Sequence, residues 1–301
     1  MKNNRKWIAM LLSGMLAISA FTGCAAGQSA DREKEKDATE ETTAFEEGQK
    51  IVVMTREDGS GTRGAFVELT GVEAKNEAGE KVDNTTVDAE VNNSTSVMLT
   101  AVAGNKYAIG YVSMGSMNDS VKAVQIDGVE ATAEKVASGE YALARPFNIA
   151  YKEDLGDLGH DFMEFILSDD GQSIIEENGY IGNKTGAAYN GSGAGKLVVA
   201  GSSSVSPVME KLIEAYAAKN TDADIELQES DSSSGMSALA EGACDIGMAS
   251  RELKDSELEQ GLIPQTIATD GIAVIVNLEN PVESLTCEEI CAIYTGETTT
   301  W

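Results

Sequence analysis

Apolar residues in this chain gather in short runs, and turns rich in glycine or serine separate the runs. The runs at residues 51–54, 107–112, 196–200 and 270–276 are mostly apolar, with Lys196 and Asp270 at the start of the last two, which is typical of buried strands. A shorter run at residues 225–227 predicts one more strand.

Other segments place apolar residues at helical spacing. A stripe of this kind predicts a helix after residue 204, formed by Val208, Met209, Leu212, Ile213 and Tyr216. Pro207 suits its first turn, and Ser204 or Ser206 is expected to cap it. Residues 64–69 also have a helical pattern, and residues 162–175 have one that we expect Gly171 to interrupt.

The segments between these elements are polar. Residues 71–93 have a loop-like pattern, and residues 183–195, with four glycines, predict a flexible linker. Strands that alternate with helices favour an α/β architecture with mostly parallel sheets. A length of 301 residues leaves room for one large or two ordinary domains.

The N-terminus predicts export. Lys2, Arg5 and Lys6 precede about 15 apolar residues, too few for a comfortable membrane span but typical of a secretory leader. The leader, residues 1–23, ends at Gly23-Cys24, which resembles the lipidation site of bacterial lipoproteins although Phe21 stands where leucine is usual. We therefore expect Cys24 to carry lipid on the extracytoplasmic face of the membrane. Residues 24–49 are acidic and nearly free of aromatic residues, which predicts a disordered tether.

Composition excludes several classes of protein. The net charge of −28 argues against nucleic-acid binding, which needs a basic surface. His160 is the only histidine, so a multi-histidine metal centre is excluded and a histidine-dependent catalytic triad is disfavoured. Cys244, Cys287 and Cys291 lack metal-ligand spacing, and we interpret them as small buried residues. We expect no metal and no cofactor.

Three turns between a strand and a helix share one chemistry. They are residues 56–62, 201–204 and 232–235, and each would place hydroxyls and free backbone N–H groups at a helix N-terminus. Such a position favours an oxyanion, because unpaired donors and the helix dipole both face it. Arg56 adds a forked positive charge that suits a tetrahedral oxyanion. Serine is also an ordinary cap, so the indication comes from three such turns together.

Two other interpretations of these turns fail. Gly59, Gly61 and Gly64 match the dinucleotide-binding spacing, but no second strand ending in an acidic residue follows at the required distance. Ser60 lies in no nucleophile-elbow motif and has no evident general base nearby, so an enzyme acting through Ser60 is a minor alternative.

The turns resemble those of a known family. Residues 55–63 are similar to the anion loop of the phosphate-binding proteins of Pst-type ABC transporters, and residues 200–205, 232–235 and 245–251 also match. The resemblance covers nearly all of residues 50–301. In that family the serine-rich block comes first, whereas here it comes second. We therefore expect a circular permutation, with residues 183–195 joining the old termini.

The resemblance implies a two-lobed type II periplasmic-binding-protein-like α/β fold. One lobe would comprise residues 50–144 and 273–301, and the other residues 145–272. It further implies a non-enzymatic monomer that captures inorganic phosphate between its lobes and passes it to membrane permease subunits. The implied ligand residues are Arg56, Ser60, Gly61, Thr62, Ser203, Ser204, Ser232 and Ser250.

One position departs from the family pattern. Some members have aspartate where this chain has Ser250, and that aspartate accepts the proton of hydrogen phosphate. Here Ser250 would accept through its hydroxyl, and Asp58 would support the site by orienting Arg56. A sensory or surface-interaction protein with a changed oxyanion ligand is the alternative function.

Overall fold

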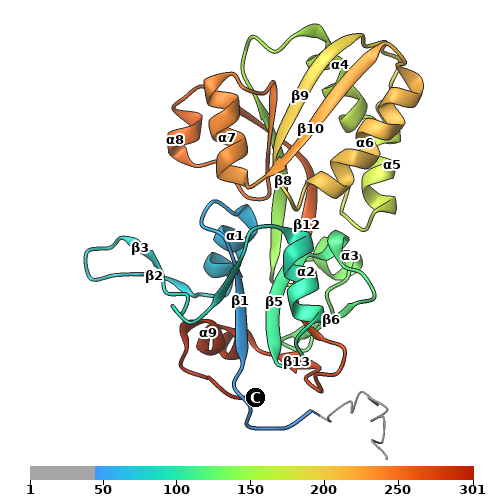
Figure 1. The fold of residues 1–301 in the computed structure, drawn as a ribbon. Coiled ribbons are helices and arrows are strands. Elements are labelled where there is room, and N and C mark those ends of the chain that lie inside the picture. The colour runs from blue at the N-terminus through green and yellow to red at the C-terminus, as the bar shows by residue number, and fades with distance from the viewer. Residues whose placement is uncertain (1–44) are drawn as a thin grey trace, which may run out of the picture. The chain divides into compact units, whose positions relative to one another are not determined.

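Two antiparallel strands, β8 (Ala144–Tyr151) and β12 (Ile263–Asn277), run between two lobes. They appear in a computed structural model that describes residues 45–301 (Figure 1). The expected leader at residues 1–23, the lipidation at Cys24 and most of the expected tether lie outside the described residues. We name the lobes after their first strands, the β1 lobe and the β9 lobe.

The β1 lobe holds the first part of the described chain and its C-terminal end. Its strands are β1 (Val52–Arg56), β2 (Glu73–Lys75), β3 (Lys81–Asp83), β4 (Glu90–Asn92), β5 (Ala108–Ser113), β6 (Val121–Ala123), β7 (Gln125–Ile126) and β13 (Ser284–Leu285). Its helices are α1 (Gly61–Leu69), α2 (Thr95–Ala103), the 3-10 turn η1 (Met114–Ser116), α3 (Ala133–Ala137) and α9 (Cys287–Thr295).

The β9 lobe is formed by the middle of the chain. Its strands are β9 (Gly195–Ser202), β10 (Ala223–Ser230) and β11 (Ile246–Ala249). Its helices are α4 (Asp157–Leu167), α5 (Asp169–Glu177), α6 (Ser206–Lys219), α7 (Ser232–Glu241) and α8 (Asp255–Leu258).

The two lobes share one continuous sheet. Its strand order is β10-β9-β11-β8-β12-β5-β1-β4, and β6 pairs with β12 beside this path. Within each lobe the three outer strands are parallel, whereas β8 and β12 run antiparallel to each other and to their lobe neighbours. Parallel strands end at the same edge of a sheet, so the turns that follow them meet at one place.

Each lobe has its own buried core. In the β9 lobe, α4, α5 and α6 pack on one face of the sheet, where Phe162, Phe165 and Tyr216 are fully buried, and α7 covers the other face. In the β1 lobe, Phe66 of α1 stacks on Tyr111 of β5 at 3.9 Å between ring centroids, and α2 covers the opposite face. The predicted α/β class follows from this alternation of strands and helices.

The predicted strands at 51–54, 107–112, 196–200, 225–227 and 270–276 are confirmed as parts of β1, β5, β9, β10 and β12. The loop predicted at 71–93 is wrong, since it contains β2, β3 and β4. These strands escaped detection because they are three residues long and mostly exposed, so they lack an apolar run.

Three expectations about the helices are corrected. Gly171 does not interrupt the pattern at 162–175: the break falls at Ser168, whose hydroxyl accepts from the Gly171 N–H and caps α5. Neither Ser204 nor Ser206 caps α6; the Ser206 hydroxyl donates instead to the Ser202 carbonyl. Pro207 does lie in the first turn, and Ile213 is only half-buried while the rest of the stripe is buried.

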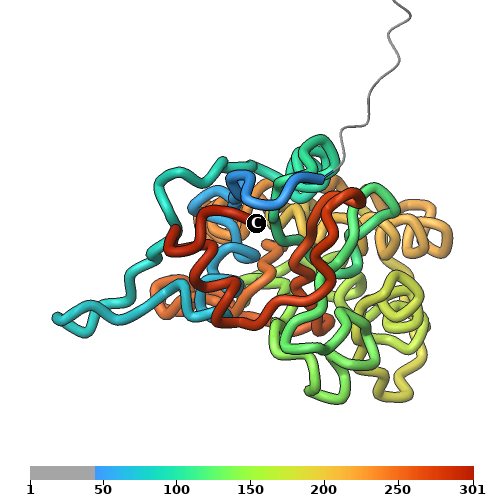
Figure 2. The backbone as a smooth tube through the Cα atoms, turned by 90° about the horizontal axis from the view of Figure 1, so that it is seen from below, coloured from blue at the N-terminus to red at the C-terminus, as the bar shows by residue number. Residues whose placement is uncertain are grey.

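The end of the chain lies against its described beginning. The Gly48 N–H donates to the Trp301 carbonyl at 2.9 Å, and the Trp301 N–H donates to the Gln49 carbonyl at 3.0 Å (Figure 2). Phe45 packs near the rings of Tyr107 and Trp301. The predicted disordered tether therefore extends too far, because residues 45–49 contact the β1 lobe.

The segment at 183–195 has no regular structure before β9 but makes defined contacts. The Tyr189 hydroxyl donates to Asp161 at 2.6 Å, and the Gly193 N–H donates to the Asn220 side chain at 3.0 Å. The Tyr216 hydroxyl shares the same Asp161 oxygen. This predicted linker is therefore anchored to α4 and α6 along its second half.

Candidate functional site

Hydroxyl groups from both lobes meet where the parallel strands end. The β1–α1 turn brings Thr62, whose Oγ1 lies 2.7 Å from Oγ of Ser204 in the β9–α6 turn. The β4–α2 turn brings Thr95, whose Oγ1 lies 3.2 Å from Oγ of Ser203. All four side chains are buried. Side chains more than 100 residues apart in the sequence thus form one hydrogen-bonded group across the lobes.

The β9 lobe adds a second set of hydroxyls. Ser202 Oγ donates to Ser250 Oγ at 3.0 Å, and Ser232 Oγ lies 3.5 Å from the same Ser250 oxygen. The Ser250 N–H donates to Ser232 Oγ at 3.1 Å. We call Arg56, Thr62, Thr95, Ser202, Ser203, Ser204, Ser232 and Ser250 the hydroxyl cluster. Hydroxyls both donate and accept, so they can turn to suit a bound group.

Arg56 supplies the charge of the hydroxyl cluster. Its side chain is 1% exposed. Nη2 donates to Ser203 Oγ at 3.0 Å, and Nη1 donates to Thr95 Oγ1 at 3.3 Å. Nε and Nη2 also donate to the two oxygens of Glu57, at 2.8 and 2.7 Å. The guanidinium is thus held in one orientation with two nitrogens directed at the serine and threonine hydroxyls.

The expected role of Asp58 is wrong. Its side chain is 99% exposed and pairs with Arg63 at 2.7 Å. Glu57 is the residue that orients Arg56, because the chain turns after β1 and directs the Asp58 side chain into solvent. Ser60 has a local role in the structure: its Oγ accepts from the Arg63 N–H at 3.3 Å and caps α1.

The main chain that carries Arg56 is supported from the core. The buried Tyr111 hydroxyl accepts from the Arg56 N–H at 3.1 Å and pairs with the Thr55 hydroxyl at 2.9 Å. Burial raises the pKa of Tyr111 to about 12, so this phenol stays protonated at neutral pH. The position of Arg56 is therefore fixed by both its backbone and its side chain.

Helices α1, α2, α6 and α7 begin beside the hydroxyl cluster. Ser60 caps α1, Ser94 caps α2 and Asp231 caps α7, the last through a 2.9 Å bond from the Ser234 N–H. The partial positive charge at a helix N-terminus favours an anion. Four helices, each of nine or more residues, therefore have their N-termini beside the hydroxyl cluster.

Glycine allows the two lobes to approach closely. A methyl group on Gly61 would lie 2.5 Å from Ser232 Oγ and 2.7 Å from Ser250 Oγ, both in the other lobe. The Gly59 carbonyl accepts from the Ser233 N–H at 3.2 Å. The backbone of the β1–α1 turn therefore contacts the β9 lobe directly, because the glycines have no side chain to separate them.

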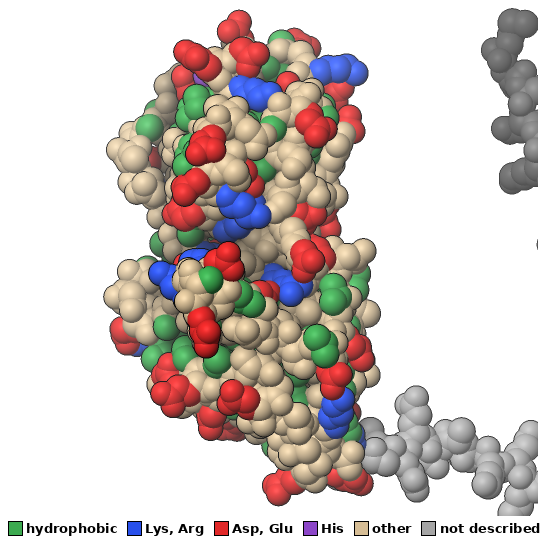
Figure 3. Space-filling model, turned by 90° about the vertical axis from the view of Figure 1, so that its left-hand side faces the viewer, with side chains coloured by type: hydrophobic (Ala, Val, Ile, Leu, Met, Phe, Trp, Pro, Cys, Tyr) green, Lys and Arg blue, Asp and Glu red, His purple; other side chains and the backbone are tan. Residues whose placement is uncertain are grey.

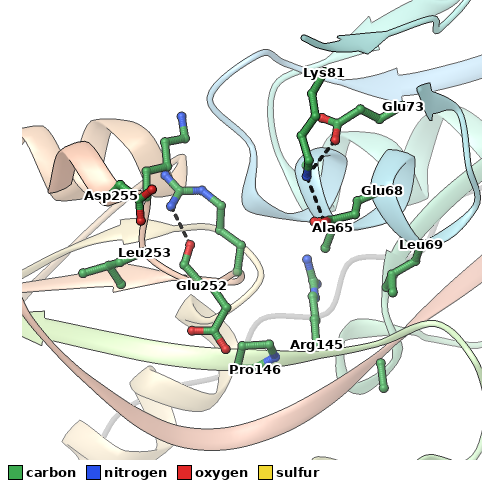
Figure 4. A pocket seen from close by; sticks show the side chains of 14 residues that line it. Ala65, Glu68, Leu69, Glu73, Lys81, Arg145, Pro146, Glu252, Leu253 and Asp255 are labelled. Carbon is green, nitrogen blue, oxygen red and sulfur yellow. Dashed lines mark hydrogen bonds and ion pairs between the residues drawn. The ribbon is translucent and has the colours of Figure 1, made fainter. Parts of the chain in front are cut away.

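A cleft of about 600 Å³ opens between the lobes beside the cluster. Arg145 points into it from β8, and Lys81, paired with Glu68 and Glu73, lies on the opposite wall (Figure 4). The pair of Arg251 and Glu257 lies at 2.8 Å nearby. Burial raises the pKa of Glu257, but hydrogen bonds from Arg251 and the Lys254 backbone outweigh that effect and lower it.

The surface around this cleft differs from the rest of the face seen in Figure 3. Lys and Arg side chains gather in the indentation between the lobes, whereas Asp and Glu side chains are common elsewhere on that face. All four arginines of residues 45–301 lie at the cluster or line its cleft and the adjoining hollow: Arg56, Arg63, Arg145 and Arg251. Arginine side chains are therefore concentrated where the lobes meet, and each of them is paired with at least one carboxylate.

No group of three or more His, Cys, Asp and Glu residues in the described range is arranged to hold a metal ion. His160 lies on α4, where its ring packs near Tyr151. Cys244 is buried, and Cys287 and Cys291 on α9 are half-buried. Burial raises the pKa of the Cys244 and Cys287 thiols to about 11.

Most of the residues expected to form the site lie together in the structure, and Gly61 packs against them. They are Arg56, Thr62, Ser203, Ser204, Ser232 and Ser250. Glu57, Thr95 and Ser202 were not predicted as site residues from the sequence. Thr95 follows β4 and Ser94 at a fourth hydroxyl-bearing turn between a strand and a helix. Recognition of that strand would have revealed the turn.

Comparisons with known proteins identify the family. The sequence model of the PBP superfamily domain matches residues 26–170 and 186–301. A phosphate-binding protein PstS 2 from Streptococcus agalactiae is 47% identical over 303 residues, which cover 100% of this chain and 98% of that protein. A PstS 2 from Streptococcus pneumoniae is 43% identical over 299 residues, or 98% of each chain.

A solved structure agrees with these matches. The crystal structure of a phosphate-binding protein of a phosphate ABC transporter from Streptococcus pneumoniae superimposes with a TM-score of 0.66 and 46% sequence identity. The superposition covers 84% of this chain and 98% of that one. The chain belongs to the PBP superfamily, and within it to the family of PstS phosphate-binding proteins.

Proposed function

We propose that this protein binds inorganic phosphate in the hydroxyl cluster and delivers it to the membrane subunits of an ABC transporter. One observation carries the proposal: a buried arginine and seven buried hydroxyl side chains from both lobes converge at the N-termini of four helices. The names of the relatives support the choice of phosphate among oxyanions. The proposed action is binding and release without catalysis.

Each group has a role in this proposal. Arg56 neutralises charge on the anion, and Glu57 holds the guanidinium in place. The hydroxyls of Thr62, Thr95, Ser203, Ser204, Ser232 and Ser250 and the backbone N–H groups of Gly61 and Thr62 donate to its oxygens. The Ser60 N–H is not among these donors, because it donates to the Glu57 carbonyl at 3.1 Å. Binding between the lobes would couple capture of the anion to a hinge motion about β8 and β12.

The proposed setting is the extracytoplasmic face of the membrane, which fits a leader at residues 1–23 and a lipid on Cys24. Among the helices of residues 45–301, none is long and apolar enough to cross a membrane. The acidic residues that follow Cys24 would hold the lobes away from the anionic membrane surface.

We also propose that the order of the two blocks arose by circular permutation. The ends of the folded part support this idea, because Lys50 and Thr300 form an antiparallel bridge. Both lobes also contain the same arrangement of three parallel strands, β10-β9-β11 in one and β4-β1-β5 in the other, with the first strand of the lobe in the middle. The segment at 183–195 would be the joint between the old termini.

The proposal is tested by titration calorimetry of Arg56→Ala with phosphate, after bound anion has been removed. Loss of a buried, charge-assisted donor should weaken binding by about tenfold or more. Lys196→Ala is the matched control, because Lys196 is 86% exposed on β9 and its removal changes the net charge equally. Equal affinity of Arg56→Ala and the control would remove Arg56 from the site.

A further inference from the structure

A second buried arginine lies outside the set that the proposed function uses. Arg145 on β8 donates from Nε and Nη2 to Oδ2 of Asp270 on β12, at 3.1 and 2.9 Å. The Arg145 side chain is 2% exposed and the Asp270 side chain is not exposed. A buried ion pair is weak support for stability, because the cost of removing both charges from water offsets their attraction. The other contacts of this pair indicate a further role.

The pair connects the two lobes to the hydroxyl cluster. Arg145 Nη1 donates to the Ser250 carbonyl at 3.2 Å, and the Ser250 hydroxyl belongs to the cluster. On the other side, Ser113 Oγ at the end of β5 donates to Asp270 Oδ1 at 2.8 Å. One network thus runs from the β1 lobe, through both crossing strands, to the β11–α8 turn.

Arg145 also contributes charge near the cluster. Its guanidinium points from β8 into the cleft between the lobes (Figure 4). Burial lowers the pKa of Arg145, and the positive charge of Arg56 lowers it further although Asp270 opposes both effects. Two buried guanidinium groups that repel each other would both be stabilised by an anion bound beside them.

We propose that Arg145 is a positioning residue for the anion site, which holds Ser250 in place and couples the crossing strands to the bound anion. Asp270 sets the orientation of the guanidinium, and Nη1 fixes the Ser250 carbonyl and with it the β11–α8 turn. This inference rests on the proposed function, because it requires an anion at the hydroxyl cluster.

The decisive variant is the double substitution Arg145→Met with Asp270→Leu. Replacement of both charges by apolar side chains of similar size removes the cost of burying them. The Ser113 hydroxyl and the Ser250 carbonyl lose their partners, so the melting temperature should fall, but the protein should still unfold cooperatively. Phosphate affinity should fall by about tenfold, because the Ser250 carbonyl loses its charged donor while the net charge near the cluster stays the same. A double variant that is folded and binds phosphate as tightly as the wild type would restrict Arg145 to a structural role.

A second variant covers the case in which the double substitution fails to fold. Arg145→Lys keeps the charge, but a single ammonium cannot reach both Asp270 and the Ser250 carbonyl as the forked guanidinium does. Its phosphate affinity should fall by about threefold to tenfold, because one charge-assisted hydrogen bond to the Ser250 carbonyl is lost. Wild-type affinity in Arg145→Lys would overturn the inference.

Ser113→Ala is the control for this series. It removes a hydrogen bond to Asp270 but leaves Arg145 and Ser250 in contact, so it should alter thermal stability and leave phosphate affinity unchanged. An equal loss of affinity in Ser113→Ala would mean that any disturbance of the pair acts alike, and would contradict a specific role for Arg145. Absence of phosphate binding by the wild-type protein would overturn the proposed function, whereas the outcomes above overturn this inference alone.

Discussion

Single hydroxyl groups give the site its chemistry. Seven buried Ser and Thr side chains are clustered with one guanidinium, which donates to two of them, and Glu57 already balances its charge. A hydroxyl can donate to an unprotonated oxygen of an anion or accept from a protonated one. A cluster of this kind therefore suits a tetrahedral oxyanion that carries a proton, such as hydrogen phosphate.

Substitution of Gly61 by alanine tests whether closure of the lobes contributes to phosphate affinity. Gly61→Ala places a methyl group against Ser232 and Ser250 of the other lobe, so it should oppose closure without disturbing the β1 lobe. Overpacking costs about 1–3 kcal/mol, which corresponds to a phosphate affinity lowered by about fivefold to 100-fold. Calorimetric titration and thermal unfolding of the same sample measure affinity and stability separately.

Gly64→Ala is the matched control for Gly61→Ala. Both positions lie in α1, but the nearest atom to a methyl group on Gly64 is 4.0 Å away. Both substitutions gain about the same helix propensity over glycine. If Gly61→Ala binds phosphate as tightly as Gly64→Ala, the close approach of the two lobes is not needed for binding.

The sequence predicted many site residues because they share a local pattern. A strand that ends at serine and glycine before a helix is visible in the letters themselves, as at Ser203 and Ser232. The partner of Arg56 was not predictable, since Glu57 and Asp58 are adjacent acids and only the path of the turn decides between them. The link between Arg145 and Ser250 spans 105 residues and leaves no local signal.

At the level of elements, a run of apolar residues decided which strands were predicted. The runs in β1, β5, β9 and β12 placed these strands within a few residues, and a short run also marked the edge strand β10. Burial alone was not sufficient, because the buried strands β8 and β11 lie in segments broken by polar residues and were not predicted from such a run. The segment at 71–93 was missed because β2 and β3 form an exposed hairpin and β4 is a short edge strand. Polar residues are compatible with a solvent-exposed edge strand as well as with a loop, so the composition of this segment does not distinguish the two.

The segment at 183–195 makes a prediction of its own. A methyl group on Gly193 would lie 1.9 Å from the Tyr216 hydroxyl and 2.7 Å from a Leu158 methyl group. Gly193→Ala should therefore destabilise the β9 lobe by about 1–3 kcal/mol. At about 2–4 °C for each kcal/mol in a chain of this size, the melting temperature should fall by several degrees.

Ser192→Ala is the control for Gly193→Ala, because Ser192 is the adjacent residue and is exposed. It should leave the melting temperature unchanged. Equal melting temperatures for Gly193→Ala and the wild type would mean that this segment is not anchored to α4 and α6 in solution.

At the scale of the whole molecule, the ends of the folded chain are close enough to be joined. Lys50 pairs with Thr300, and the Ile51 N–H donates to the Thr299 carbonyl at 2.9 Å. Both streptococcal PstS 2 proteins match this chain over nearly their full lengths, so they have the same order of blocks. The order therefore belongs to a group of proteins rather than to this chain alone.

A rearranged chain tests the proposed permutation. It would begin at residue 187, run through Trp301, continue by a short added turn into Lys50 and end at residue 186, so that Tyr189 and its contacts are kept. Because the new ends lie in a surface segment and the joined ends are neighbours, it should fold and bind phosphate within about threefold of the wild type. A chain opened inside β12 is the control and should fail to fold. Failure of the first chain alone would contradict the proposed equivalence of the two orders.

The central claim is that the hydroxyl cluster holds phosphate in a protein whose net charge is −28. The most direct test is calorimetric titration of the anion-stripped wild-type protein with phosphate at physiological salt, where distant surface charges are screened beyond about 8 Å. Saturable binding of one phosphate per chain is the predicted result. A protein that is folded, as shown by cooperative thermal unfolding, yet takes up no phosphate would contradict the claim.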